Sequence, residues 1–569
     1  MHWRQRLVTG IFAVCGIALA ARLIQIQWLD QARFAARASR QQQFDERIAA
    51  RPGDIYDRNG RLLATTTRTH SLYVDPSRIA DPPNLARQLG EALQLDPGAL
   101  TDRLQRSRDR RFLWIKRRLS AGETAAVRAL ELPDDVWGFE PEYLRNYPQG
   151  PLAAHVLGLR DIDGVGRGGV EEKFDDQLRG RDGRRRLVRD ARGFVIDVLD
   201  SAGDPAVDGR DVTLTIDSVI QLFVERELDG LMDQWQPQSA CAIVLDPQSG
   251  DVLAMASRPG FNPNRPDQVP ADAWTNTAIA STFEPGSTFK PSVVAWGLEQ
   301  GRITSDEVFD CEYGAYRMGR RILHDHHPYG SLDLAGVLIK SSNIGMAKIG
   351  ERLGNAGLHA AADNFGFGRR TGIELPGELP GTLRPLAEWT SYSTGSIPMG
   401  QELSATPLQV LVSLATLANG GQAISPHLLI SVSGPTPSAR DVVSKSVVSP
   451  AIADWIIQTA LVGVVERGTG QKAQIEGLKV FGKTGTAQKI DPETGRYSST
   501  RYVSSFACGA PAENPRAVVL VSVNEPAAGA SYYGGTVAAP AAAAILKQAL
   551  ALLDDETRST TAPQTRTQR

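Results

Sequence analysis

Cysteine is scarce in this chain of 569 residues, and the net charge is close to zero. The four cysteines are too few and too scattered for a disulfide framework, so we predict no structural disulfide. The net charge of −2 at pH 7 provides no long-range field to attract a polyanion. The composition therefore argues against a nucleic-acid partner and for a globular protein with two or three cores.

Long apolar runs are also missing, except at the amino terminus, where the run from Leu7 to Ala21 is followed by Arg22. This run is shorter than the about 20 residues that span a bilayer, so alone it also fits a signal peptide with a cleavage site at Ala18-Leu19-Ala20. If Arg22 extends its charged end to the membrane surface and Trp28 lies at the interface, the same stretch is an uncleaved anchor. Length alone leaves both interpretations open.

The most informative segment is Ser287-Thr288-Phe289-Lys290. A serine hydroxyl is a weak nucleophile at neutral pH and needs a base within hydrogen-bonding distance. Residues three apart on a helix share one face, so Lys290 is placed to take the proton from Ser287. The preceding Glu284-Pro285-Gly286 predicts that the hydroxyl lies at the amino end of a helix, where backbone N–H groups are free. On its own, such a pair is more common as a solvated helix face.

Two further segments complete the same chemistry, first Ser341-Ser342-Asn343 and then Lys483-Thr484-Gly485-Thr486. Three signals in a fixed order arise by chance far less often than any one of them. Together they resemble the penicillin-binding and serine β-lactamase superfamily.

Segments of the amino-terminal half narrow this resemblance to one family. The stretch from Arg51 to Gly60, followed by Leu62-Leu63-Ala64, resembles the signature that opens the non-catalytic domain of class B penicillin-binding proteins, with a proline intervening before its glycine. Phe112 to Ile115 and Gly166 to Glu171 fit the same domain. The resemblance covers nearly the whole chain, and it favours the uncleaved anchor.

The resemblance implies an α+β fold. It comprises a penicillin-binding/serine β-lactamase-like transpeptidase domain, whose five-stranded antiparallel sheet is flanked by helices, an elongated α+β pedestal domain of the dimerisation type, and one amino-terminal transmembrane helix. We expect a cytoplasmic stub and anchor at 1–29, the pedestal at 30–211, the transpeptidase domain at 212–553 and a disordered tail at 554–569. The tail lacks large apolar residues. Locally, Val212 to Ile216 predicts a strand, Asp217 a helix cap, and Ala240 to Ala256 a hairpin.

The resemblance also implies catalytic roles. Ser287 would attack a carbonyl with neutral Lys290 as its base, which requires burial or the charge of Lys483 to lower the lysine pKa. Ser341 would pass a proton to the leaving amine. Asn343 would hydrogen-bond both the substrate amide and Lys290.

The substrate would be held along Lys483 to Thr486. The backbone N–H groups of Thr486 and of the nucleophile would form the oxyanion hole. The hydroxyl groups of Thr484 and Thr486, with the Lys483 ammonium, suit the carboxylate of a peptide ending in D-Ala-D-Ala, and Gly485 would let a substrate backbone approach closely. No cofactor is implied.

The implied function is a peptidoglycan D,D-transpeptidase that cross-links stem peptides through a serine acyl-enzyme and is inhibited covalently by β-lactams. Phe283 to Gly286, and Tyr532 to Gly535 followed by Ala539-Pro540, look more like the septal enzymes of cell division than the elongation-type enzymes, which stay the alternative. A β-lactamase would need a carboxylate that activates water, and its chain is typically far shorter. A β-lactam sensor would need a signalling module. Intact motifs argue against an inactive scaffold.

The resemblance further implies a location and partners. The chain would be a single-pass protein of the cytoplasmic (inner) membrane, with its bulk on the outer, periplasmic face. Because no glycan-polymerising domain is recognisable, a separate membrane glycan polymerase and divisome proteins are the expected partners.

One cluster, His324-Asp325-His326-His327, is not placed by the resemblance. Its three imidazoles with Cys311 suggest zinc, but neighbouring residues in a short extended piece cannot all turn towards one ion. We therefore expect loop-ordering or solvated histidines and no metal.

Overall fold

The computed structural model describes residues 2–133, 135–189, 195–434, 445–491, 493–527 and 531–561. Contacts divide the chain into two compact units. Unit 1 comprises Met1–Gly53, Thr67–Leu144 and Arg179–Gly209, and unit 2 comprises Asp54–Thr66, Arg145–Leu178 and Arg210–Arg569. The units interleave along the chain, whereas the sequence analysis divides it at a single point, residue 211. The predicted domain bounds stay a prediction.

Unit 1 begins with a long helix and continues with short helices and strands. The helices are α1 (His2–Ile24), which continues as a π-helical turn at Gln25–Leu29, α2 (Gln31–Gln42), α3 (Pro82–Leu93), α4 (Pro97–Arg106) and α5 (Ala121–Arg128). The strands are β1 (Gln43–Ile48), β4 (Leu113–Leu119), β8 (Gly183–Arg189) and β9 (Val195–Asp204), with most of β3 (Leu62–Val74) and β5 (Trp137–Asn146).

The apolar amino-terminal segment forms one continuous helix, His2–Leu29, which is long and apolar enough to cross a membrane by length and composition. None of the residues in its apolar 18-residue window is buried in the described structure, and Trp28 is 83% exposed. Arg22 donates from Nη1 to Gln25 Oε1 at 2.8 Å, so the cation that interrupts the apolar run does not break the helix.

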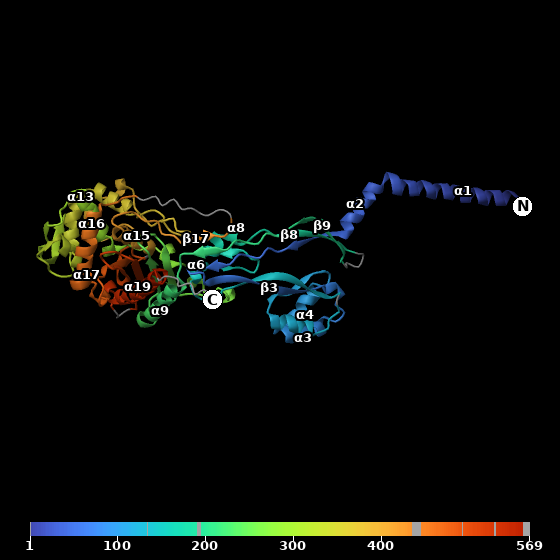
Figure 1. Ribbon diagram of the computed structural model, residues 1–569, viewed down its shortest axis with the longest axis horizontal. Coiled ribbons are helices and arrows are strands. Elements are labelled where there is room, and N and C mark those ends of the chain that lie inside the picture. The colour runs from blue at the N-terminus through green and yellow to red at the C-terminus, as the bar shows by residue number, and fades with distance from the viewer. Residues whose placement is uncertain are drawn as a thin grey trace, which may run out of the picture. The chain divides into compact units, whose positions relative to one another are not determined.

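The remainder of unit 1 has its own small core. The strands β1, β8 and β9 form an antiparallel sheet, and β3 pairs with both β4 and β5. Asp81 and Asp96 each accept a backbone N–H bond at the start of α3 and α4, and a proline occupies the first turn of both helices. The two helices bury leucines against β3 and β4 (Figure 1).

Unit 2 contains the larger core. Its main helices are α9 (Ser218–Trp235), α11 (Lys290–Glu299), α12 (Leu334–Ile339), α13 (Asn343–Asn364), α15 (Pro407–Ala418), α16 (Pro450–Asp454), a π-helical turn (Trp455–Leu461), α17 (Val462–Arg467) and α19 (Ala539–Thr561). Shorter helices are α6 (Ala154–Leu157), α7 (Gly169–Lys173), α8 (Asp175–Leu178), α10 (Thr277–Ala280), α14 (Ser393–Ser396) and α18 (Gly534–Val537).

The strands of unit 2 are distributed over several sheets. They are β2 (Ile55–Tyr56), β6 (Leu159–Arg160), β7 (Gly166–Arg167), β10 (Val212–Leu214), β11 (Ser239–Leu245), β12 (Val252–Arg258), β13 (Val308–Asp310), β14 (Ala315–Met318), β15 (Arg321–His324), β16 (Ser331–Asp333), β17 (Leu429–Val432), β18 (Phe481–Ile490), β19 (Tyr497–Ala510) and β20 (Ala517–Asn524).

A five-stranded antiparallel sheet in the order β12-β11-β20-β19-β18 lies at the centre of unit 2, as the sequence analysis predicts. Its strands are buried on both faces. In β11, Ala240 and Val244 belong to a core made with α9 and α19, whereas Ile243 and Leu245 belong to a core made with α11 and α15. Because side chains alternate across a strand, this explains the continuous apolar run of β11. The two edge strands are β12 and β18.

The predicted local signals are confirmed. The β11–β12 hairpin forms, and Asp217 caps α9 by accepting N–H bonds from Val219 and Ile220 at 2.8 and 3.1 Å. A turn also follows β2, in which Asp57 Oδ1 accepts from Asn59 N at 2.9 Å.

Strand β2 was expected in a separate pedestal domain, but it pairs with a strand of unit 2. It runs parallel to β10, with Ile55 opposite Val212. Asp57, which is fully buried, also accepts the Ser218 hydroxyl at 2.6 Å. A buried carboxylate needs such partners, so the amino-terminal signature is built into unit 2.

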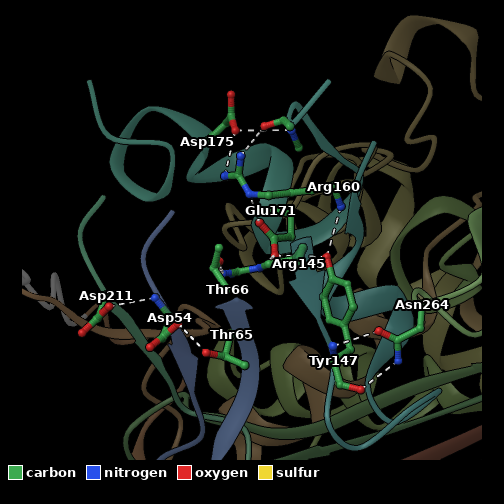
Figure 2. Close-up of polar contacts among 12 residues, drawn as sticks. Asp54, Thr65, Thr66, Arg145, Tyr147, Arg160, Glu171, Asp175, Asp211 and Asn264 are labelled. Carbon is green, nitrogen blue, oxygen red and sulfur yellow. Dashed lines mark hydrogen bonds and ion pairs between the residues drawn. The ribbon is translucent and has the colours of Figure 1, made fainter. Parts of the chain in front are cut away.

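A buried ion-pair cluster forms around Glu171, which belongs to the predicted Gly166 to Glu171 motif (Figure 2). Its two carboxylate oxygens accept from Arg145 Nε at 2.6 Å and from Arg160 Nε at 2.7 Å. The Tyr147 hydroxyl donates to the same carboxylate at 3.1 Å, and Arg160 also pairs with Asp175 at 2.9 Å. Removing one partner of a buried pair costs about 3–5 kcal/mol, so Glu171 is a structural requirement of this region.

The carboxyl-terminal tail differs in part from the prediction of disorder. Helix α19 continues beyond Leu553, the last residue of its buried apolar face, and ends at Thr561. Arg516 pairs with Asp554 at 3.2 Å, and extending an existing helix costs little compared with starting one. Residues 562–569 lie outside the described residues.

The four cysteines are free. Cys241, Cys311 and Cys508 are buried, and burial raises the pKa of the Cys241 thiol to about 12. Such thiols pack as small apolar side chains.

Candidate active site

Ser287 lies in a 3₁₀ turn, Gly286–Thr288, that leads into α11, so its hydroxyl lies at the amino end of a helix, as the sequence predicts. Gly286 adopts a φ of 56°, and its N–H donates to Gly400 O at 3.1 Å. A Cβ on Gly400 would lie 2.1 Å from Gly286 O, so this approach requires glycine. The hydroxyl of Ser287 is thereby presented on a tight, fixed turn.

Lys290 is the first residue of α11 and is completely buried. Its Nζ donates to Ser341 O at 2.7 Å, Asn343 Oδ1 at 2.9 Å, Ser341 Oγ at 3.3 Å and Ser342 O at 3.4 Å. Burial lowers the pKa of Lys290 to about 7, because water no longer stabilises the ammonium, while the charge of Asp325 acts in the opposite direction. Near neutral pH the side chain therefore exchanges a proton readily.

Ser341 connects the two parts of the site. Its Oγ donates to Ser287 Oγ at 3.0 Å and accepts from Lys483 Nζ at 2.9 Å as well as from Lys290. Ser341 has a φ of 58°, which is rare for a residue with a side chain. Such a conformation is less stable than the usual ones, and it persists where the surrounding contacts of a functional site hold it.

This arrangement corrects one geometric expectation. Among the described residues, no hydrogen bond joins Lys290 directly to Ser287, although their spacing places both at the same turn. Four acceptors on the segment from Ser341 to Asn343 occupy the ammonium instead. The contact between the predicted nucleophile and the predicted base runs through Ser341.

Lys483 lies in the edge strand β18 and is 1% exposed. Burial lowers its pKa well below the usual value, and the charge of Lys290 lowers it further. Two ammonium groups thus share one hydroxyl acceptor, which favours a state in which they do not both carry a proton.

The rest of the Lys483 to Thr486 segment faces the same site. Thr484 Oγ1 lies 2.8 Å from Thr469 Oγ1, and Thr486 Oγ1 accepts from Gly534 N at 3.2 Å. Gly485 is packed within the protein, since a Cβ there would lie 2.3 Å from Ser505 Oγ and 2.9 Å from Thr288 Cγ2. Its visible role is to let β18 approach the turn that carries Ser287.

Asp325 is a site residue whose role the sequence analysis does not find. Its carboxylate accepts from the Ser342 hydroxyl at 2.6 Å and from Ile344 N at 3.1 Å, and so caps the amino end of α13. Asn343 Nδ2 donates to His324 O at 3.0 Å. The sequence signal that could have identified Asp325 is its position as the one acidic residue in the run His324-Asp325-His326-His327.

A pocket of about 420 Å³ opens over Ser287, Ser341, Thr484 and Thr486. His326 lies in its wall with its ring 5.8 Å from that of Tyr533, and burial lowers the pKa of this imidazole. Among the residues that the structure describes, no group of three or more His, Cys, Asp or Glu side chains is arranged to hold a metal ion.

The structure therefore brings Ser287, Lys290, Ser341, Asn343 and Lys483 into one hydrogen-bonded group, with Thr484 and Thr486 lining the pocket above it. Such a group can activate a hydroxyl, because a lysine with a pKa of about 7 can accept a proton at neutral pH. Strand β18 ends the sheet, and an edge strand is an element with which an extended peptide can pair.

The chain matches two family models. Residues 240–547 match the penicillin-binding protein transpeptidase domain, and residues 47–214 match the penicillin-binding protein dimerisation domain. With this fold and this site, the chain belongs to the class B penicillin-binding proteins.

Individual relatives agree with this membership. The chain is 34% identical over 501 residues to the probable peptidoglycan D,D-transpeptidase PenA of Neisseria meningitidis, covering 87% of this chain and 83% of that protein. It is 31% identical over 561 residues to the peptidoglycan D,D-transpeptidase FtsI of Escherichia coli, covering 98% and 93%. Among solved structures, penicillin-binding protein 3 of Mycobacterium tuberculosis complexed with aztreonam has a TM-score of 0.69 and 29% identity, covering 90% of this chain and 97% of that chain.

The neighbourhood of Lys290 predicts a pH effect of Asp325. We expect β-lactam acylation to rise with pH through about 7, where Lys290 loses its proton, and then to level off. In Asp325→Asn the carboxylate charge no longer stabilises the ammonium, so the pKa of Lys290 falls and the rising limb moves to lower pH. Stopped-flow acylation with a fluorescent penicillin between pH 5 and 9 measures this midpoint.

Asp325→Glu, which keeps the charge, serves as the matched control and should keep its midpoint close to that of the unaltered protein. The same midpoint in Asp325→Asn would mean that this carboxylate does not act on the titrating group.

Proposed function

We propose that the chain is a peptidoglycan D,D-transpeptidase that cross-links stem peptides through a serine acyl-enzyme, and that β-lactams inhibit it by acylating the same serine. The observation that carries this proposal is the hydrogen bond of 3.0 Å from Ser341 Oγ to Ser287 Oγ, with two buried lysines bonded to Ser341. Membership in a family that binds stem peptides and β-lactams supports it.

In the proposed first step, Ser287 Oγ attacks the carbonyl carbon of the penultimate D-alanine. Its proton passes through the Ser341 hydroxyl to neutral Lys290, a route that the hydrogen bonds permit because hydroxyl hydrogens rotate. The tetrahedral intermediate then collapses. The C–N bond breaks, Ser341 returns a proton to the leaving D-alanine amine, and the acyl group stays on Ser287.

The substrate contacts are proposed from the pocket. The N–H groups of Ser287 and Thr486 would stabilise the oxyanion, and Asn343 would bind the peptide amide. The substrate carboxylate would lie against the hydroxyls of Thr484 and Thr486 with Lys483 beneath. In the second step an acceptor amine attacks the ester, the new C–N bond forms, and Ser287 Oγ leaves with a proton.

The assignment of the nucleophile is testable by mass. Intact-mass spectrometry of the full chain after benzylpenicillin should show one covalent adduct, which Ser287→Ala abolishes because no other hydroxyl occupies that position. Ser292→Ala, which changes a buried serine of the following helix α11, should keep the adduct. An adduct retained in Ser287→Ala would place the nucleophile elsewhere.

The lifetime of that adduct separates a transpeptidase from a β-lactamase. With no activated route for water, the adduct should outlast by far the turnover time of an ordinary enzyme, which completes about 1 to 1000 cycles per second. Stem peptides ending in D-Ala-D-Ala, with a free side-chain amine on the acceptor, should give cross-linked dimers. Rapid destruction of penicillin without cross-linked product would support the β-lactamase alternative.

We further propose a septal role with a membrane glycan polymerase and divisome proteins as partners. The support is the sequence around Tyr532 to Gly535 and before Ser287, and elongation-type enzymes remain the alternative. Depleting the protein in its own host should give long filaments, because cells then grow without dividing. Rounded cells would indicate a role in elongation instead.

The amino-terminal helix is proposed to be an uncleaved single-pass anchor of the inner membrane, with the bulk of the chain on the periplasmic face. Arg4 and Arg6 would remain on the cytoplasmic side, in line with the excess of basic residues there. The mature protein should then begin at or near Met1 and resist extraction by salt and alkali. Amino-terminal sequencing that starts near Ala21, with soluble protein, would show a cleaved signal peptide.

A further inference from the structure

The pocket above Ser287 is lined by charged groups of one sign. Lys340 and Lys472 line it, and none of the described residues that line it carries a carboxylate. Both lysines are exposed at the protein surface. Among the ion pairs of the described residues none involves Lys340 or Lys472, although Glu476 lies four residues after Lys472 in sequence, and Glu466 pairs with Arg467 at 3.8 Å. Asp325 is engaged at the amino end of α13.

These two lysines lie on a defined side of the pocket. Lys340 directly precedes Ser341, and its Nζ lies 3.4 Å from Arg467 O, just before the loop that leads to Lys472. The same loop carries Thr469, which is hydrogen-bonded to Thr484 at 2.8 Å. The lysines therefore extend the wall against which the proposed substrate carboxylate would lie, next to the buried Lys290 and Lys483.

This charge pattern bears on the second substrate. An alkylamine is protonated in neutral water and must lose its proton before it can attack the acyl-enzyme. A cation is repelled on entering a pocket whose charged lysine side chains face no carboxylate in the lining, and low-dielectric walls strengthen that effect. A carboxylate beside the amine removes the net charge and offers the lysines a partner.

We propose that Lys340 and Lys472 select an acceptor whose reactive amine lies beside a carboxylate, as in an amino acid, over an isolated amine. This inference rests on the proposed transpeptidase function and narrows its acceptor class. The reaction itself is unchanged: the unprotonated amine nitrogen forms a bond to the acyl carbon, the bond from that carbon to Ser287 Oγ breaks, and the amine proton passes to Oγ.

A matched pair of acceptors tests the proposal with the full-length chain in detergent micelles. An N-acyl-D-alanyl thioester serves as the donor, which acylates Ser287 and releases its thiol. D-Alanine and D-alaninamide then compete for the acyl group. D-Alanine carries a carboxylate beside its amine, and D-alaninamide carries a neutral amide in the same place. The ratio of the two products, referred to the unprotonated fraction of each amine, is independent of how fast each variant is acylated.

We expect the unaltered protein to favour D-alanine, and we expect the ratio to fall about three- to tenfold in the double variant Lys340→Gln, Lys472→Gln. That range corresponds to exposed ion pairs of ordinary strength. Lys472→Glu should lower the ratio further, because it repels the acceptor carboxylate. Lys479→Gln removes an exposed lysine paired with Glu513 outside the pocket and should leave the ratio unchanged.

Two outcomes would overturn the inference, and they differ in what else they overturn. If acyl-enzyme forms but the ratio is the same in the lysine variants as in the unaltered protein, the two lysines do not select the acceptor, while the transpeptidase function stands. If neither thioester nor penicillin acylates the chain, the proposed function fails and the inference fails with it.

Discussion

The burial of two lysines against one serine hydroxyl is the constraint on which the site depends. Lys290 and Lys483 are 0% and 1% exposed, and both donate to Ser341 Oγ. Burying an ammonium is costly unless it is bonded or loses its proton. The segment from Ser341 to Asn343 supplies hydrogen-bond acceptors for the Lys290 ammonium. These bonds do not fully replace the lost hydration of the ammonium, so its pKa falls to about 7. A lysine that titrates near neutrality is thus a consequence of packing.

Several features of the fold serve to hold that segment. Ser341 has a positive φ, which lets both its carbonyl and its hydroxyl meet Lys290. Asp325, which follows β15, holds the start of α13 through the Ser342 hydroxyl. Gly485 lets β18 pack closely against the turn that carries Ser287. These residues come from elements far apart in the chain, so the central sheet and its helices have to be complete before the site exists.

The motifs Ser-x-x-Lys, Ser-x-Asn and Lys-Thr-Gly are local, so they can be recognised in the sequence, and the five-stranded sheet was expected from the family resemblance that these motifs carry. They did not predict Asp325 or Thr469, whose partners lie elsewhere in the chain. They also placed Lys290 in direct contact with Ser287, since helical spacing contains no information about the acceptors that compete for the ammonium. The parallel pairing of β2 with β10 was also missed, because a strand of two residues is too short to show an alternation of apolar and polar side chains.

The shared hydroxyl also links substrate binding to the state of the base. Two ammonium groups on one acceptor repel each other, so the lysine pair is most stable when only one of the two amines is protonated to an ammonium. The charge of Lys290 lowers the pKa of Lys483, whereas Asp325 stabilises the ammonium of Lys290. In the proposed complex, a substrate carboxylate beside Lys483 would favour the proton there and would thereby disfavour a proton on Lys290. Binding of an anionic peptide would in this way leave Lys290 neutral when Ser287 has to lose its proton.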